Sequence, residues 1–199
     1  MNMEVRVLPL EPMPHKLLAI DPGLRNLGVA AFKDGKLLYA KLVKTNKKNP
    51  MPLALKDITD ALEKECGLDF NEVVIETPKI YPGRRGKANP RDILNLTAVV
   101  GAICTLYRKS KITTYEPYKW KGNCPKKITE HRVRKRLAEA ELKKIKLAGA
   151  LSHNIFDAIG IGLYYLKEHV SKFFLNKYNL SLNTRHHIVL LTMSGNPHY

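Results

Sequence analysis

The segment Leu17–Gly23 constrains the fold of this chain more than any other stretch. It opens with four apolar residues bounded by a turn signal, a pattern that predicts a short buried strand ending at Ile20. Asp21 stands where this strand ends, and Pro22-Gly23 turns the chain at once. A buried carboxylate without a partner is costly. Asp21 is therefore either a solvated turn residue or a group that other parts of the chain must compensate.

Two more acids occupy similar positions. The apolar run Val73–Ile75 predicts another buried strand, which ends in Glu76 and is closed by Thr77-Pro78, because proline cannot donate to a sheet ladder. Asp157 lies in the predicted helix His153–Val170, which is apolar over most of its length. Each of the three acids is thus expected where water is scarce.

Taken singly, each acid has an ordinary structural explanation. A strand-end acid can cap a neighbouring helix, and a helical aspartate can pair with a lysine. Three carboxylates that all need compensation can share it by binding a divalent cation, and hard oxygen ligands suit Mg²⁺ or Mn²⁺. Asn154 lies one helical turn before Asp157, and His153 lies four residues before it, so both lie close to Asp157 on the predicted helix.

The charge balance points to a polyanionic partner. The 199 residues include 34 Lys and Arg against 18 Asp and Glu, a net charge of +16, which favours nucleic acid as the partner. No basic amphipathic stretch or transmembrane run argues for a membrane. The three cysteines, Cys66, Cys104 and Cys124, form no disulfide or zinc pattern. We therefore expect a soluble intracellular protein.

Periodicity predicts an α/β order of elements. The predicted strands are Leu17–Ile20, Leu27–Phe32, Leu37–Val43, Val73–Ile75 and Lys111–Tyr115. The predicted helices are Leu53–Glu65, Asp92–Arg108, Thr129–Leu142 and His153–Val170. Asp34-Gly35 predicts a hairpin turn, so the first three strands form an antiparallel meander. We also predict a basic loop over Tyr118–Lys127, Thr129 as a helix cap and a candidate strand over Ile188–Leu191.

The order of these elements resembles the RNase H-like fold of RuvC-type Holliday junction resolvases. Ile20-Asp21-Pro22-Gly23 with Gly28 is similar to that family's first motif, and Val74-Ile75-Glu76 is similar to its second. Ser152-His153-Asn154 with Asp157-Ala158-Ile159-Gly160 is similar to its last motif. Trp120-Lys121-Gly122 with Pro125-Lys126-Lys127 resembles the bacteriophage branch.

The resemblance implies a fold class and a domain layout. The fold would be α/β, with an RNase H-like mixed five-stranded sheet and helices on both of its faces. The nuclease domain would cover residues 15–170, between an N-terminal extension at 1–14 and a basic C-terminal tail at 171–199. Two departures stand out. Asn154 occupies a position where the family commonly has an acid or histidine, and Tyr81 lies two residues later than the aromatic expected after the second acid.

The resemblance also implies an activity. The chain would be a crossover junction endodeoxyribonuclease, a homodimer that binds four-way DNA junctions and nicks two strands symmetrically, in recombination or DNA repair. Asp21, Glu76 and Asp157, with Asn154 or His153, would hold two Mg²⁺ or Mn²⁺ ions per active site, about 4 Å apart. Either Lys121 or Lys126 would stabilise charge on the scissile phosphate.

The remaining predictions concern the surface. The expected DNA-binding residues are Lys79, Tyr81, Arg84, Arg85, Lys87, Arg91, Lys119, Trp120, Lys127 and Arg132. The helix Asp92–Arg108 is apolar nearly all round, so we expect a dimer interface there, with Leu96, Val99 and Ile103 facing the second subunit. Two alternatives stay open: another RNase H-like nuclease, acting on flaps or RNA–DNA hybrids, or a nucleic-acid-binding protein of this fold that has lost its metals.

Overall fold

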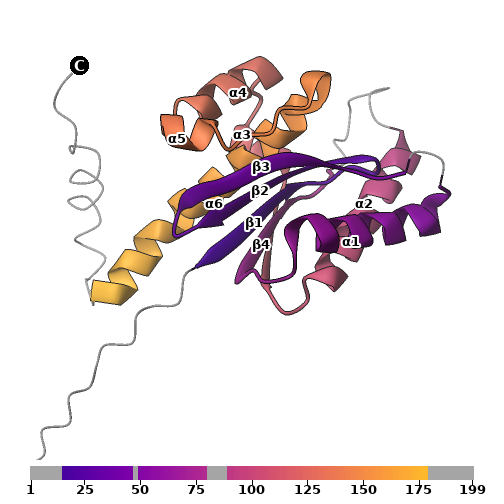
Figure 1. Cartoon of the computed structure of the whole chain (residues 1–199), viewed down its shortest axis with the longest axis horizontal. Coiled ribbons are helices and arrows are strands. Elements are labelled where there is room, and N and C mark those ends of the chain that lie inside the picture. The colour runs from indigo at the N-terminus through magenta and orange to yellow at the C-terminus, as the bar shows by residue number, and fades with distance from the viewer. Residues whose placement is uncertain (1–14, 47–48, 80–88, 179–199) are drawn as a thin grey trace, which may run out of the picture.

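A mixed five-stranded sheet forms the centre of the molecule (Figure 1). The computed structural model describes residues 15–46, 49–79 and 89–178. The strands are β1 Lys16–Asp21, β2 Asn26–Lys33, β3 Lys36–Lys44, β4 Glu72–Glu76 and β5 Lys111–Tyr115. Their order across the sheet is β3-β2-β1-β4-β5, with β1 to β3 antiparallel and β4 and β5 parallel to β1. The predicted meander and the predicted five-stranded sheet are both confirmed.

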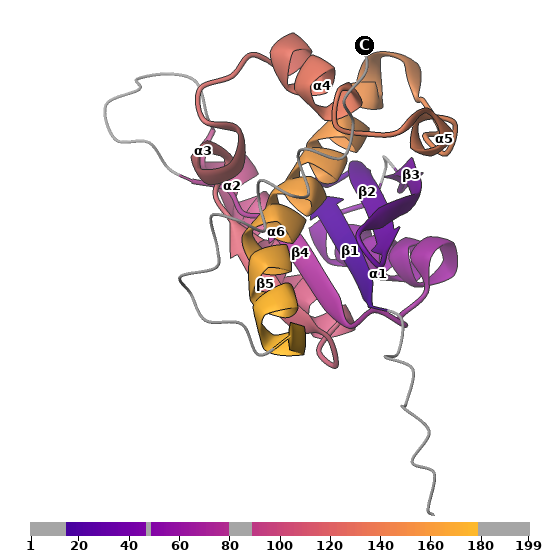
Figure 2. The same ribbon diagram turned by 90° about the vertical axis from the view of Figure 1, so that its left-hand side faces the viewer.

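Helices cover both faces of this sheet, as predicted. The helices α1 Met51–Cys66 and α2 Pro90–Leu106 pack on one face. The long helix α6 Ser152–Tyr178 crosses the other face (Figure 2). The molecule thus has two apolar layers, one on each side of the sheet.

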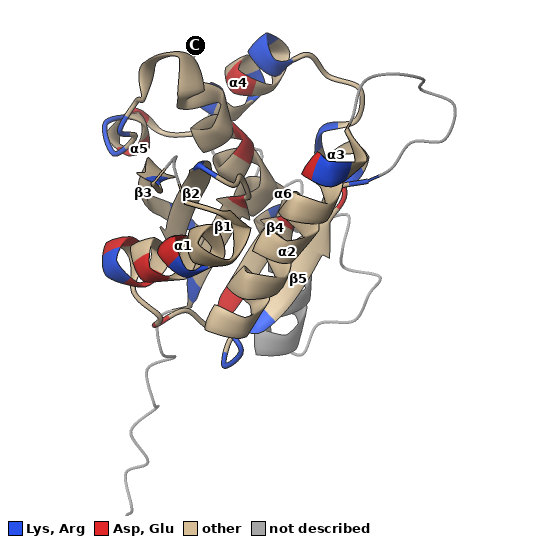
Figure 3. Ribbon diagram, turned by 90° about the vertical axis from the view of Figure 1, so that its right-hand side faces the viewer, with Lys and Arg blue, Asp and Glu red and all other residues tan. Residues whose placement is uncertain are grey.

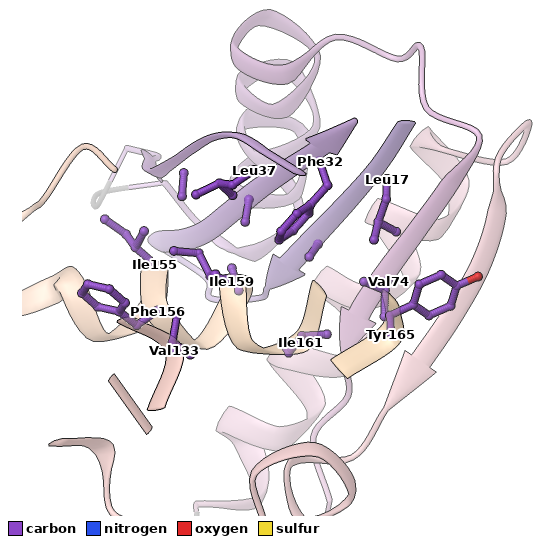
Figure 4. Packing of buried hydrophobic residues seen from close by; sticks show 14 of the residues in the cluster. Leu17, Phe32, Leu37, Val74, Val133, Ile155, Phe156, Ile159, Ile161 and Tyr165 are labelled. Atoms are coloured by element: carbon purple, nitrogen blue, oxygen red, sulfur yellow. The ribbon is translucent and has the colours of Figure 1, made fainter. Parts of the chain in front are cut away.

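Alternation along the strands decides which layer each side chain joins. In β1, Leu17 and Ala19 pack under α6, while Leu18 and Ile20 pack under α1 and α2. Val74 of β4 lies on the α6 side, where it packs with side chains from that helix (Figure 4). Because successive side chains point to opposite faces, this alternation also fixes the face on which each strand-end acid lies.

The region between β5 and α6 differs from the prediction. It contains α3 Pro117–Lys121, α4 Lys126–Arg134, α5 Glu139–Leu142 and the 3₁₀ turn Gly149–Leu151. The loop predicted over Tyr118–Lys127 is therefore partly helical, and the single helix predicted over Thr129–Leu142 is two. Thr129 does not cap a helix. It lies inside α4, where its hydroxyl donates to the carbonyl of Pro125 at 3.4 Å.

Glu141 explains why the predicted helix divides. One of its carboxylate oxygens accepts from the backbone N–H of Ala138 at 2.9 Å, which starts α5 anew. The other accepts from the backbone N–H of Leu37 in β3 at 2.7 Å. Close by, Ala40 of β3 exchanges backbone hydrogen bonds with Lys144 and Lys146. This segment therefore covers the outer edge of β3, which a continuous helix would not do.

Helix α6 runs to Tyr178, eight residues beyond the predicted end at Val170. The predicted boundary between domain and tail at residue 170 therefore falls inside a helix. The N-terminal extension and the candidate strand Ile188–Leu191 lie outside the described residues, and the division into domain and tails stays a prediction. No helix in the described part of the chain has the length and apolarity needed to cross a membrane.

Candidate active site

Two of the three acids meet at neighbouring strand ends. β1 and β4 run parallel, and Ile20 pairs with Ile75, so Asp21 and Glu76 are the next residues on the two strands. Ala19 and Val74, two residues earlier, both face α6. By the same alternation the side chains of Asp21 and Glu76 point toward α6.

The third acid comes from α6 itself. Asp157 is 7% exposed and lies in the part of the helix that packs on the sheet. The helix approaches closely because β2 has a glycine at the crossing: a Cβ built on Gly28 would lie 1.9 Å from the carbonyl oxygen of Asn154. Gly28 is also the residue that pairs with Asp21 across the sheet. A larger side chain at position 28 would push the start of α6 away from Asp21.

Electrostatics show that Asp21, Glu76 and Asp157, here called the acid triad, act on one another. Burial raises the pKa of Asp21 well above its ordinary value, and the charges of Glu76 and Asp157 raise it further. Burial likewise raises the pKa of Glu76; Lys121 and Trp120 act in the opposite direction without cancelling it. Two of the three acids are thus short of positive charge in the protein alone.

Lys121, the last residue of α3, supplies part of that charge. Its Nζ lies 2.9 Å from Oδ2 of Asp157 and 3.3 Å from Oε2 of Glu76, and its side chain is only 20% exposed. Burial alone would lower the pKa of Lys121, but the charges of Glu76 and Asp157 outweigh it and raise the pKa above the ordinary value. The lysine is therefore held charged between two carboxylates. Lys126, which opens α4, lowers the pKa of Asp21 through its charge, so it also acts on the triad.

Trp120 reaches the site from the same short helix. Its indole Nε1 donates to Oε2 of Glu76 at 2.7 Å. The ring packs on the backbone of α6, because a Cβ built on Gly160 would lie 2.4 Å from it. We predicted a DNA contact for Trp120 and did not foresee this contact with Glu76. Its position next to Lys121 in the sequence was the available signal.

The two candidate additional ligands lie at the start of α6. The ring nitrogen Nδ1 of His153 lies 2.9 Å from the carbonyl oxygen of Ala150, so the preceding 3₁₀ turn fixes the orientation of the ring. Asn154 contacts β2 through its backbone, beside Gly28. Their roles as ligands stay predictions.

The predicted DNA-binding residues have mixed positions. Tyr81, Arg84, Arg85 and Lys87 lie outside the described residues. Arg91 and Lys127 are exposed, at the starts of α2 and α4. Lys79 pairs with Glu116, Lys119 lies over the ring of Tyr115 at 4.9 Å, and Arg132 donates to Sγ of Cys124 at 2.8 Å. Figure 3 shows basic residues on α3 and α4, the two helices that flank the triad.

The predicted dimer contacts need correction. Val99 and Ile103 are fully buried in the single chain, where they pack with strand side chains beneath α2. They cannot also face a second subunit, so that prediction is wrong; Leu96 is half-buried. The outward face of α2 instead presents Leu94, which is 70% exposed, followed by Thr97, Gly101 and Thr105.

The donor chemistry of the triad fits a divalent cation. Carboxylate oxygens are the ligands that Mg²⁺ and Mn²⁺ prefer, and the raised pKa values of Asp21 and Glu76 show that more positive charge would be favourable. Within the described ranges, no three His, Cys, Asp or Glu side chains are already grouped as metal ligands. The ammonium of Lys121 lies between Glu76 and Asp157. A cation that used both carboxylates would compete with it.

The sheet order, the helix α6 across one face of the sheet and the acids at its strand ends define an RNase H-like fold. Solved structures confirm this. RuvC from Thermus thermophilus, in complex with a Holliday junction substrate, is 20% identical and matches 77% of this chain and 96% of its own, with a TM-score of 0.55. A second structure of Thermus thermophilus RuvC is 22% identical over the same shares, with a TM-score of 0.50.

The yeast mitochondrial Holliday junction resolvase Ydc2 is 14% identical and matches 90% of this chain and 86% of its own, with a TM-score of 0.53. At such identities the likeness concerns the fold. These neighbours give no support to the predicted bacteriophage branch. No protein-family model matches the chain, and no curated protein sequence matches it.

Proposed function

We propose that this chain is a structure-specific endodeoxyribonuclease that cleaves four-way DNA junctions. The convergence of Asp21, Glu76 and Asp157 around Lys121 carries the proposal, because a phosphodiester nuclease needs both a carboxylate cluster and positive charge at one point. The fold supports the proposal, because one structural neighbour, RuvC, is in complex with a Holliday junction substrate and another, Ydc2, is a Holliday junction resolvase. The net charge of +16 supplies the attraction for DNA.

The reaction is the hydrolysis of one phosphodiester bond per strand. The oxygen of a water molecule bonds to phosphorus and one bridging phosphorus–oxygen bond breaks, leaving a phosphate on one strand end and a hydroxyl on the other. The acid triad would hold Mg²⁺ or Mn²⁺, with Asn154 or His153 as a further ligand. When bound, these cations activate the water and stabilise the leaving oxygen. Lys121 and Lys126 would stabilise the negative charge that grows on the phosphate.

We further propose a homodimer formed through the outward stripe of α2, which consists of Leu94, Thr97, Gly101 and Thr105. Both threonine hydroxyls donate to carbonyls of their own helix, at 2.9 and 3.0 Å, so neither hydroxyl needs an acceptor on a second subunit. A Cβ at Gly101 would meet nothing within 4 Å, so a second helix has room to approach. A dimer of this kind would have a two-fold axis, and two active sites related by that axis suit two symmetric nicks.

The junction would lie on the basic side of the site. Arg91, Lys119, Lys127 and Arg132, with the predicted contacts in the segment 80–88, would bind backbone phosphates and set the register of the DNA. Such a nuclease would work inside a bacterial or phage-infected cell, and a bacteriophage origin stays a prediction from the segment 120–127.

One observation favours a second candidate. Because Lys121 already contacts two carboxylates, the triad is partly neutralised without any metal. That arrangement would suit a DNA-binding protein of this fold that has lost its metals. Asp21 is the argument against it, since burial and its acidic neighbours leave its pKa raised in spite of Lys121.

The test is incubation of the purified protein with labelled four-way junction, linear duplex, flap and RNA–DNA hybrid, with and without Mg²⁺ or Mn²⁺. Symmetric nicking of the junction alone, dependent on the cation, is expected. Asp21→Asn and Asp157→Asn should bind the junction and not cut it. If the protein cleaved flap or RNA–DNA hybrid in preference to the junction, that substrate would replace the four-way junction in the proposal. Binding without cleavage at any cation concentration would favour the second candidate.

A further inference from the structure

Trp120 is half-buried and holds one oxygen of Glu76. Its Nε1 donates to Oε2 at 2.7 Å, and Nζ of Lys121 lies 3.3 Å from the same oxygen. Among the described residues none donates to the other oxygen, Oε1. Within the described part of the chain, Glu76 is thus held through one oxygen, and the other is available to a ligand.

The indole is itself fixed from behind. A Cβ built on Gly160 would lie 2.4, 3.1 and 3.3 Å from three carbons of the six-membered ring, so the ring packs directly on the backbone of α6. Gly160 is one helical turn beyond Asp157, on the same helix. The indole thus bridges α6 and β4, the two elements that supply Asp157 and Glu76.

The same ring contacts Lys121 through its face. Nζ of Lys121 lies 4.7 Å from the centre of the Trp120 ring, within the range of a cation–π interaction. The two neighbours in α3 nevertheless do different things. Lys121 adds charge, whereas an indole N–H is a neutral donor that cannot accept a hydrogen bond. Trp120 can therefore set the orientation of Glu76 without changing the charge of the triad.

We propose, on the basis of the nuclease function above, that Trp120 is a positioning residue that orients Glu76 toward the cation and does not contact DNA. Groups that hydrogen-bond to metal ligands typically change metal affinity about 10- to 100-fold when they are removed. This role would replace the DNA contact predicted for Trp120 from the sequence.

The test uses Trp120→Phe, which keeps an aromatic ring and removes the N–H. Titration calorimetry of the DNA-free protein should show Mn²⁺ affinity about 10- to 100-fold weaker than in the wild type. Junction affinity without divalent cation should be unchanged. Tyr118→Ala is the matched control, because Tyr118 is an aromatic of the same helix that is 61% exposed, and its loss should leave Mn²⁺ affinity as it is.

A second measurement needs no variant. Trp120 is the only tryptophan, so paramagnetic Mn²⁺ bound at Glu76 should quench the intrinsic fluorescence, with the midpoint found by calorimetry. Two results with Trp120→Phe would overturn the positioning role: unchanged Mn²⁺ affinity, or weaker junction binding with normal Mn²⁺ affinity. Saturable Mn²⁺ binding to the wild type without quenching would also overturn it. A wild type that binds Mn²⁺ but leaves junctions intact would overturn the nuclease function instead. The comparison of Mn²⁺ affinity between wild type and Trp120→Phe would still be valid.

Discussion

Replacing Lys121 with methionine removes the ammonium that lies 2.9 Å from Asp157 and 3.3 Å from Glu76. Methionine keeps an unbranched apolar chain of similar length, so the change removes charge more than volume. The side chains of Asp157 and Glu76 are both largely buried and would face each other and Asp21 without that ammonium. We expect Lys121→Met to destabilise the protein when no divalent cation is present.

The size of the effect follows from the burial of the pair. Removing one partner of a buried ion pair costs about 3–5 kcal/mol, and the lower end applies here because Lys121 is 20% exposed. Uptake of a proton by Glu76 would relieve part of this, which leaves about 2–3 kcal/mol. For a chain of this length each kcal/mol lowers Tm by about 2–4 °C, so Tm should fall by roughly 4–12 °C.

The assay is thermal unfolding from pH 5 to pH 9, with and without Mg²⁺. The difference between wild type and variant should shrink as the pH falls through the raised pKa of Glu76, because a protonated Glu76 no longer needs the ammonium. Mg²⁺ should stabilise the variant more than the wild type, since the cation no longer competes with Lys121. Lys127→Met, at an exposed lysine, is the matched control and should change little.

Two results would refute this reasoning. If Lys121→Met were as stable as the wild type at pH 7 without Mg²⁺, the ammonium would not be compensating the triad. If Mg²⁺ stabilised both proteins equally, Lys121 and the cation would not share a site.

Three other changes test separate parts of the structure. Asp21→Asn should raise Tm at pH 7 without divalent cations. The pKa of Asp21 is raised in the folded protein, so the stabilising contribution of this carboxyl group is lost as the pH rises through that pKa. An unchanged Tm in calorimetry would contradict this. Leu94→Lys should give a monomer by sedimentation at micromolar concentration, because a charge would lie in the α2 stripe; a persistent dimer would place the interface elsewhere. Asn154→Asp should lower the Mg²⁺ concentration for half-maximal cleavage, because it adds a charged oxygen ligand, and no change would leave His153 as the candidate ligand.

The sequence predicted the sheet and the acid triad because both follow from local patterns. Apolar runs that stop at Asp21 and Glu76 mark strand ends, and alternation places both acids on one face. Gly28 shows the limit of this reasoning. It was part of a recognisable motif, yet its steric role depends on a helix that starts more than a hundred residues later.

The errors have the same origin. The helix predicted over Thr129–Leu142 divides because Glu141 binds the backbone of Leu37, a contact between distant parts of the chain that periodicity cannot show. The interface prediction failed because an apolar helix does not reveal which of its faces the sheet covers. The structure places Val99 and Ile103 against the sheet and leaves Leu94, Thr97, Gly101 and Thr105 outward.

Helix α3 joins the basic surface to the acid triad within three residues. Successive side chains on a helix point about 100° apart, so neighbours in the sequence reach different surroundings. Lys119 lies over Tyr115 and is exposed, Trp120 holds Glu76, and Lys121 contacts Asp157. A DNA strand bound at Lys119 would therefore lie one or two residues from the groups that orient and neutralise the triad. Shifting α3 would change phosphate binding and cation binding together, whereas Lys127→Met should change phosphate binding alone.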